Sequence, residues 1–218
     1  MGDFRDELRS VLPNDLPNLE ALIEMAARHL ELIEETNRQI NLTRITSPRE
    51  AAIKHVLDSV LPWRWFAGAK RVLDAGTGAG FPGLPLAVVL PDVQFTLAES
   101  TGKKARFVQG AVEELGIGNV GVVSARAEDW LRSERADLIT GRALAPIERA
   151  CAFFAPALRG GARALLYKGP DADTEIAEAA ATARRLQIRL SVVERYELPD
   201  GAGVRTLVEI VRFLDLDS

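Results

Sequence analysis

The sequence is poor in the residues that bind metals or form disulfides, with one cysteine and two histidines among 218 residues. A single cysteine, Cys151, forms no intramolecular disulfide and supplies no thiolate cluster, which excludes a disulfide-stapled secreted fold and a zinc ribbon. With only His29 and His55 available, we also expect no histidine-rich metal site. These absences predict a cytoplasmic protein without a bound metal.

Long hydrophobic runs are also absent. No apolar stretch reaches the roughly 18 residues that a membrane-spanning helix needs, and residues 1–7 carry acids where a secretory signal carries bases. Internal repeats and linkers rich in glycine, serine and proline are missing as well. With 47% hydrophobic and 27% charged residues, the chain is predicted to fold as one globular unit.

The first 69 residues show helical patterns. Apolar residues recur at three-to-four spacing over residues 17–36, which predicts an amphipathic helix. A second helix is predicted to start at Ser47, because Ser47 can cap it, Pro48 fits the first turn and Glu50 stands three residues after the cap. We therefore expect residues 1–69 to form a helical N-terminal extension.

From residue 70 onward, short β-branched runs alternate with helical stretches. Strands are predicted at 71–74, 93–99, 120–124, 136–140, 162–167, 189–198 and 204–212, and helices at 84–90, 103–115, 127–132, 147–158 and 173–186. No helix separates the last two strands. The pattern predicts an α/β fold for residues 70–218, with a mostly parallel sheet and an antiparallel C-terminal strand, on which the extension packs.

A glycine-rich loop follows the first predicted strand, with Gly76, Gly78 and Gly80 at alternate positions. Glycines there permit tight turns and close approach of the backbone to a ligand. Together with Gly83, the last two also match the dinucleotide fingerprint, and Glu99 lies where an acid can hold a ribose. An NAD-dependent oxidoreductase is therefore one interpretation.

Asp74, which ends the first strand, favours a different ligand. Its carboxylate would repel a pyrophosphate but suits a ligand that carries an ammonium or a sulfonium. S-adenosylmethionine carries both cations, as well as a ribose that Glu99 can hold. The alternative is that the glycines only mark turns and that Asp74 only caps a helix.

Several motifs resemble one known family, and the resemblance runs from about Glu31 to the C-terminus. The motifs are Asn41-Leu-Thr43, His55-Val-Leu-Asp58-Ser59, Asp74-Ala-Gly-Thr-Gly-Ala-Gly-Phe-Pro-Gly83-Leu-Pro85, Leu97-Ala-Glu99-Ser100, Arg126-Ala-Glu128, Gly141-Arg142-Ala143 and Tyr167-Lys168-Gly169. They resemble the 16S ribosomal RNA guanine-N7 methyltransferases (RsmG), also called glucose-inhibited division protein B. One departure is Ala79, where many members have proline.

The resemblance implies a class I, Rossmann-like methyltransferase fold that binds S-adenosylmethionine and acts on small-subunit ribosomal RNA. It implies cofactor contacts from residues in the glycine loop and after the third and fourth strands, with Glu99 on the ribose. These residues are Gly76, Phe81, Ala127, Glu128 and Arg142, to which the loop itself adds Asp74 and Gly78. We expect a monomer whose substrate is naked RNA or an assembling particle.

Methyl transfer to nitrogen 7 of guanine needs no general base, because that nitrogen carries a free lone pair and no proton. We therefore expect residues that position the substrate rather than a catalytic triad. Arg142 and Lys168 end the fourth and fifth strands, where they could hold RNA phosphate or the guanine edge. The alternative is that both are ordinary cations at strand ends.

His55 is a further candidate for positioning the substrate. It stands one helical turn before Asp58, so the two could share a hydrogen bond, either as a structural tie or as an RNA contact. The Asn41-to-Thr43 stretch could equally be a turn between helices or part of the substrate surface. Trp63, Trp65 and Phe66 could stack on bases but are more typical of a core.

Three other functions share part of this pattern. A methyltransferase of a small metabolite or a protein would have the glycine loop without the His55-to-Ser59 and Phe81-to-Pro85 motifs. An oxidoreductase rests only on the Gly78, Gly80 and Gly83 match. A non-enzymatic RNA-binding or nucleotide-binding module would not need the loop, the ribose acid and the strand-end arginine together.

The net charge of −4 argues at first against a nucleic-acid substrate. Residues 1–36, however, hold 3 basic and 9 acidic residues, whereas residues 37–71 hold 7 basic and 2 acidic ones. The basic excess thus lies in the second half of the extension. We expect RNA phosphates to dock there, with the acidic first predicted helix facing away.

Overall fold

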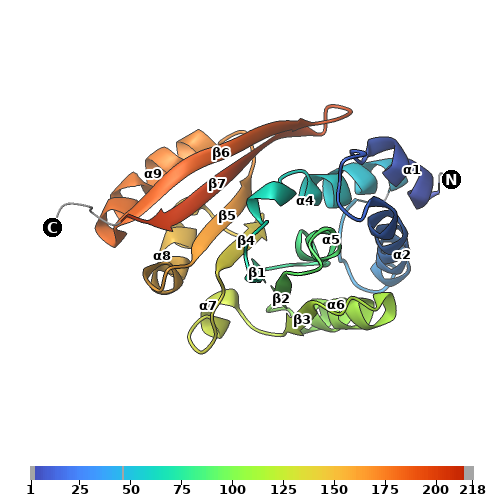
Figure 1. The fold of residues 1–218 in the computed structure, drawn as a ribbon, viewed down its shortest axis with the longest axis horizontal. Coiled ribbons are helices and arrows are strands. Elements are labelled where there is room, and N and C mark those ends of the chain that lie inside the picture. Colours follow the sequence, from blue (N-terminus) through green and yellow to red (C-terminus); the bar gives the residue numbers. More distant parts are fainter. Residues whose placement is uncertain (1–2, 46, 214–218) are drawn as a thin grey trace.

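The computed structural model describes residues 3–45 and 47–213, which form one α/β unit around a seven-stranded sheet (Figure 1). The strands are β1 (Arg71–Ala75), β2 (Gln94–Ala98), β3 (Val120–Val123), β4 (Leu138–Arg142), β5 (Arg163–Lys168), β6 (Ile188–Leu198) and β7 (Gly203–Arg212). Their order is β3-β2-β1-β4-β5-β7-β6. All neighbours are parallel except β7, which runs antiparallel to both β5 and β6. The predicted sheet, including its antiparallel last strand, is confirmed.

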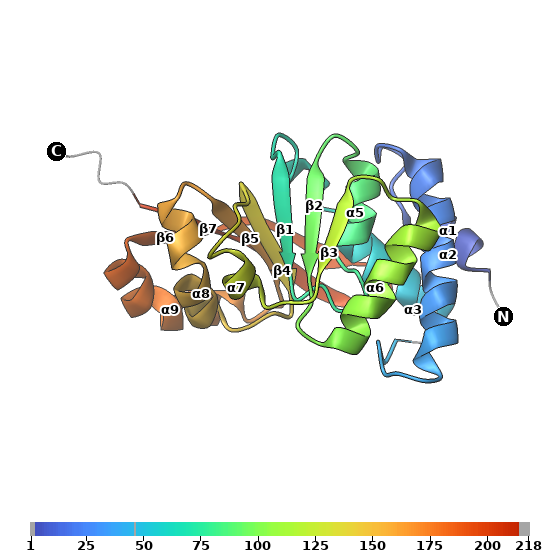
Figure 2. The same cartoon turned by 90° about the horizontal axis from the view of Figure 1, so that it is seen from below.

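Helices cover both faces of this sheet (Figure 2). They are α5 (Gly83–Val89), α6 (Gly102–Leu115), α7 (Ala127–Trp130), α8 (Ile147–Arg159) and α9 (Ala172–Leu186). Successive side chains of a strand point to opposite faces. Val72 of β1 therefore joins the core that includes α5 and the N-terminal helices, whereas Leu73 joins the core beneath α7, α8 and α9.

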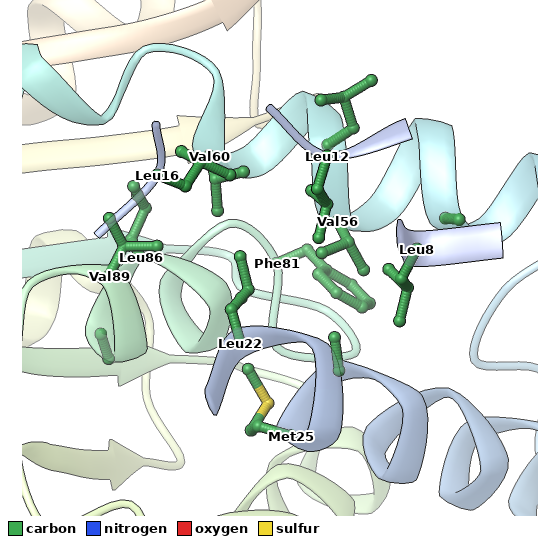
Figure 3. Close-up of a cluster of buried hydrophobic side chains, with 14 of the residues drawn as sticks. Leu8, Leu12, Leu16, Leu22, Met25, Val56, Val60, Phe81, Leu86 and Val89 are labelled. Carbon is green, nitrogen blue, oxygen red and sulfur yellow. The ribbon is translucent and has the colours of Figure 1, made fainter. Parts of the chain in front are cut away.

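The N-terminal extension packs against the glycine loop and α5 (Figure 3), in a core that also includes Val72 of β1. It contains α1 (Phe4–Val11), α2 (Leu19–Asn37), a helix over 48–60 and a 3₁₀ turn at Trp63–Trp65. Leu8 and Leu22 of the extension lie fully buried in one cluster with Leu86 and Val89 of α5. The extension is thus packed against the sheet layer as part of one continuous core.

Two features of the extension depart from the sequence pattern. The helix α1 was not predicted; Asp3 caps its start by accepting a hydrogen bond from the Arg5 backbone at 3.0 Å. The second predicted helix does begin beside Ser47, whose hydroxyl caps the Glu50 N–H at 3.3 Å. Its middle turn, Ala52–Leu57, is π-helical, between α3 (Pro48–Ala51) and α4 (Asp58–Val60). A π-helical turn is uncommon and frequently marks a functional site.

Within residues 3–45 and 47–213, no helix combines the length and the hydrophobicity required to cross a bilayer. The same residues contain no cluster of histidine, cysteine or acidic side chains that could hold a metal ion.

His29 of α2 is fully buried in the shared core, between the rings of Phe81 and Phe107. Burial lowers the pKa of His29 to about 4, an effect that the nearby Ala79 backbone offsets only in part. Neither ring nitrogen makes a hydrogen bond of normal geometry to the described residues. This histidine is therefore neutral at physiological pH and unfavourable to protonate.

Replacing His29 by leucine is expected to make the fold less sensitive to acid. The unfolded chain binds a proton at His29 near pH 6.5, but the folded protein binds it only near pH 4. The effect of His29 on the free energy of unfolding is therefore independent of pH above about 6.5. Below that, the free energy of unfolding falls by up to about 3 kcal/mol as the pH drops towards 4. Urea unfolding from pH 7.5 to 4.5 should show a shallower decline for His29→Leu. Parallel curves for the two proteins would contradict this account.

Candidate cofactor and substrate site

The glycine loop follows β1 at the carboxyl edge of the sheet, where ligands bind in open α/β folds. Gly76, Gly78 and Gly80 all have positive φ angles, of 71°, 63° and 103°. L-residues with side chains rarely adopt such angles, so glycine is required for this path of the chain. The backbone N–H groups of Gly76 and Thr77 donate to the Ala98 carbonyl at 2.9 and 3.1 Å, which fixes the loop against β2.

Asp74 is completely buried beneath this loop. Its Oδ2 accepts hydrogen bonds from the Thr77 hydroxyl at 2.6 Å and from the Gly83 N–H at 2.9 Å. Its Oδ1 is buried and has no partner among the described residues. Burial raises the pKa of Asp74 to about 6, against the opposing effect of those two hydrogen bonds. A buried carboxylate oxygen without a partner is costly, so this arrangement suits a cationic ligand beside the loop.

Glu99 follows β2 directly and lies next to the loop. Its Oε2 accepts from the Gly78 N–H at 3.1 Å, and its Oε1 accepts from the Thr101 N–H at 2.7 Å. The carboxylate is thus held between the glycine loop and the start of α6. Each oxygen keeps acceptor capacity for a hydroxyl donor, as the predicted ribose contact requires.

A cavity of about 280 Å³ opens beside the glycine loop. Its wall brings together Gly76, Ala127 and Glu128, three residues that the family resemblance had assigned to the cofactor. Ala98, Ser100 and Arg126 of the same wall lie in the quoted motifs but had no assigned role. The sequence analysis had not indicated the other residues of this wall, which are Ala125, Leu144, Ala145, Arg149, Phe153 and Phe154. Neighbouring Ala143 has a positive φ of 53°, a strained angle that often occurs at functional sites.

Arg142 lies at the end of β4 and is not part of this cavity wall. Its guanidinium lies over the Phe81 ring, 5.6 Å from the ring centroid. One terminal nitrogen, Nη1, donates to the Lys54 carbonyl at 2.6 Å and to Asp58 Oδ2 at 3.1 Å. Arg142 therefore connects the extension to the glycine loop, a contact that its place in the sequence did not predict.

His55 completes this contact, since its ring stacks on Phe81 with centroids 4.7 Å apart and planes 7° apart. Its Nε2 is 3.1 Å from the Thr43 hydroxyl, and its Nδ1 is 3.5 Å from Nη2 of Arg142. Burial, followed by the charge of Arg142, lowers the pKa of His55 to about 3, so the ring is neutral. The suggested His55–Asp58 hydrogen bond is not made: Arg142 and Arg205 donate to Asp58 instead.

Lys168, the other predicted positioning residue, is nearly buried at the end of β5. Its ammonium pairs with Glu175 at 2.6 Å and donates to the Ala145 carbonyl at 2.9 Å. Glu175 also accepts from the Ile147 N–H at 2.9 Å. Lys168 thus supports the chain between β4 and α8, and an RNA contact from it stays a prediction.

The turn after α2 is organised by Asn37, a residue that the sequence analysis had passed over. Its side-chain oxygen accepts from the N–H groups of Leu42 and Thr43 at 2.8 and 3.2 Å, and its amide donates to the Thr43 carbonyl at 2.9 Å. The Asn41-to-Thr43 stretch is therefore held against the end of α2 as part of the irregular connection to α3, with Thr43 reaching His55. A substrate contact from this stretch stays a prediction.

The basic stretch 37–71 is partly neutralised by acids from elsewhere in the chain. Arg49 pairs with Asp200 and Glu7, Lys54 with Glu50, and Arg64 with Asp15. Arg38 and Arg44, both exposed in the turn after α2, form no ion pair with the described residues. Nearby Phe66 is fully buried, and the half-buried Trp65 donates to Glu194 at 2.8 Å, as expected of residues that stabilise a core.

The strand order, the glycine loop over a buried carboxylate, and the acid after β2 define a class I methyltransferase fold. A solved magnesium protoporphyrin IX methyltransferase from Synechocystis has this fold, with a TM-score of 0.59 at 15% identity over 84% of this chain and 97% of that one. A putative O-methyltransferase from Klebsiella pneumoniae has a TM-score of 0.58 at 17% identity over 95% of this chain and 94% of that one.

Sequence comparison identifies the family within that class. The family model GidB, described as rRNA small subunit methyltransferase G, matches residues 22–200. A ribosomal RNA small subunit methyltransferase G from Solibacter usitatus is 63% identical over 95% of this chain and 99% of its own. The protein of the same name from Symbiobacterium thermophilum is 41% identical over 86% and 81%. This chain therefore belongs to the GidB family, which confirms the resemblance seen in its motifs.

Proposed function

We propose that the protein transfers a methyl group from S-adenosylmethionine to nitrogen 7 of a guanine in 16S ribosomal RNA. The observation that carries this proposal is the buried, unpartnered Oδ1 of Asp74 beneath the glycine loop of a GidB-family chain. The two ribosomal RNA methyltransferases G described above, at 63% and 41% identity, support the substrate class.

The residues of the site fit S-adenosylmethionine. Asp74 would face its cationic end, Glu99 would hold its ribose hydroxyls, and the cavity wall with Gly76, Ala127 and Glu128 would receive its base. When bound, this cofactor supplies an activated methyl group on a sulfonium. Among the solved structures that share the fold, the Synechocystis enzyme was determined with it bound.

The protein's part in the reaction is positioning, because nitrogen 7 of guanine gives up no proton. The transfer needs the donor methyl and the acceptor nitrogen in line and near contact distance. His55 is neutral, packed against Phe81 and hydrogen-bonded, which suits a wall of the site better than a proton acceptor. Arg142 keeps its Nε and part of Nη2 for the guanine edge or a phosphate.

The RNA must present its guanine in an accessible form. A base stacked within a duplex cannot reach a donor held at the edge of the sheet, so the target would lie in a loop or be extruded. The exposed Arg38 and Arg44 would meet phosphates near the site. With this substrate the protein would act in the cytoplasm, and we propose that it acts as a monomer.

Transfer of labelled methyl to unmodified small-subunit ribosomal RNA tests this proposal. The RNA is offered free and within 30S particles, and the modified base is mapped afterwards. We expect incorporation at one guanine, in a form that carries the positive charge of 7-methylguanine. No incorporation into either substrate, with S-adenosylmethionine still bound in calorimetry, would overturn the RNA assignment and favour a metabolite or a protein as acceptor.

A further inference from the structure

Asp58 is the most heavily bonded buried side chain outside the residues already assigned. It begins α4 in the extension, and its side chain is 1% exposed. Its Oδ2 accepts from Nη1 of Arg142 and from Nε of Arg205, both at 3.1 Å. Its Oδ1 accepts from the Tyr196 hydroxyl, also at 3.1 Å. One carboxylate thus joins the extension to β4, β6 and β7.

The π-helical turn before Asp58 adds a second acceptor for the same arginine. In a regular α-helix the N–H of residue 58 would donate to the carbonyl of residue 54. Here the Asp58 N–H donates to the Ile53 and Val56 carbonyls instead. The Lys54 carbonyl accepts from Nη1 of Arg142 at 2.6 Å. The helix therefore offers Arg142 a carbonyl and a carboxylate side by side.

These two acceptors fix one end of the guanidinium. Arginine side chains are otherwise flexible, and most of their conformational freedom must be lost before they can position a substrate. With Nη1 held by Lys54 and Asp58, Arg142 lies over Phe81 of the glycine loop. The second arginine, Arg205, shares the carboxylate and leaves the cluster with a net positive charge, which favours an approaching RNA phosphate.

We propose that Asp58 is a positioning residue for methyl transfer. It holds Arg142 over the glycine loop, in the orientation that receives the RNA. The proposal rests on the proposed function, because it assumes that Arg142 positions the RNA substrate. With its side chain 1% exposed, Asp58 would itself touch neither cofactor nor RNA. Its effect on activity must therefore pass through Arg142.

A double-mutant cycle tests this dependence. Asp58→Asn, Arg142→Gln and the double variant are compared in single-turnover methyl transfer to the RNA substrate, with affinity for S-adenosylmethionine measured separately. We expect Asp58→Asn to reduce transfer at least tenfold in the native background but less than threefold when Arg142 is already glutamine. An equal reduction in both backgrounds would show that Asp58 acts independently of Arg142 and would overturn the proposal.

Glu209→Gln is the matched control for loss of a carboxylate beside an arginine. Glu209 on β7 pairs with Arg163 at 3.3 Å, at the opposite edge of the sheet from the glycine loop. We expect this variant to lower the melting temperature while it leaves methyl transfer unchanged. If transfer in both variants only follows the loss of melting temperature, Asp58 has a structural role alone.

A readout without RNA separates this proposal from the proposed function. The terminal nitrogens of an arginine give separate NMR signals when rotation of its guanidinium is hindered. We expect such signals from Arg142 in the native protein, assigned by their absence in Arg142→Lys, and their averaging in Asp58→Asn. Unchanged signals in Asp58→Asn would overturn the positioning role even if the RNA proves not to be the substrate.

Discussion

Methyl transfer to small-subunit ribosomal RNA is expected to fall at least about 100-fold when Arg142 is replaced by glutamate. The change removes the hydrogen bonds to Lys54 and Asp58 and the contact over Phe81. It also brings a second carboxylate towards the fully buried Asp58, where like charges repel strongly. A 100-fold loss corresponds to about 2.7 kcal/mol, roughly the worth of one or two charge-assisted hydrogen bonds.

Single-turnover transfer of labelled methyl measures this effect. Arg142→Gln, which adds no repelling charge, separates loss of the guanidinium from damage to the fold. Arg195→Glu is the control for an added negative charge, because Arg195 is exposed and pairs with Asp173 between β6 and α9. Arg195→Glu should keep close to full activity. Native rates in Arg142→Glu would remove this arginine from the proposed mechanism.

The affinity for S-adenosylmethionine is expected to fall by about 10- to 100-fold when Asp74 is replaced by asparagine. The amide can still accept a hydrogen bond in place of Oδ2, from Thr77 or Gly83. It carries no charge, however, and so loses the attraction of the buried carboxylate for a cationic ligand. An effect of this size corresponds to about 1.4 to 2.8 kcal/mol.

This loss should depend on pH in a direction that the structure fixes. The pKa of Asp74 is raised to about 6, above that of an exposed carboxyl. The cation binds the carboxylate form, so native affinity should rise as the pH increases through 6 and should level off above it. Asp74→Asn should lack this rise. Calorimetry between pH 5 and 8 measures both, and an equal pH dependence in the two proteins would show that another group titrates.

The alternation of strands and helices could be predicted because it depends on local sequence patterns, namely short β-branched runs and apolar residues at helical spacing. Strand ends and helix ends agree with the structure to within about two residues for most elements, as for the helix predicted at 147–158 and found at Ile147–Arg159. The short helix α1 was missed because its eight residues carry few apolar positions, and Leu8 alone is buried. Its stability comes from packing against the rest of the extension, which no local pattern shows.

The residues of the candidate site that lie in one loop could be predicted from the sequence. The contacts between segments far apart in the chain could not. Gly76, Gly78 and Asp74 stand together in the sequence, and the structure keeps them together. The bonds of Arg142 to Lys54 and Asp58 span more than 80 positions of the chain. Spacing in the sequence suggested a pair between His55 and Asp58, but the π-helical turn and the two arginines gave Asp58 other partners.

The basic excess of residues 37–71 is a second case in which contacts between distant residues change what the sequence predicts. Counting charges along the chain located it correctly, but Arg49, Lys54 and Arg64 are each paired with an acid in the folded protein. The charge available to RNA on this stretch is therefore smaller than the sequence indicates. Arg38, Arg44, Lys70 and Arg71 are exposed and form no ion pair with the described residues, but Lys70 and Arg71 lie at the start of β1, so only Arg38 and Arg44 are near the glycine loop's end of the sheet.

The ring of Phe81 lies between His29 of α2 and His55 of the π-helical turn, so two walls of the glycine loop come from the extension. This has a consequence for how such a protein can evolve. A recognition module that is merely attached to a catalytic domain can be exchanged for another with a new specificity. Here an exchange would also remove the rings that pack against the loop. If the extension receives the RNA and the loop binds the methyl donor, as proposed above, substrate range and donor binding must change together, by substitutions within one inherited core.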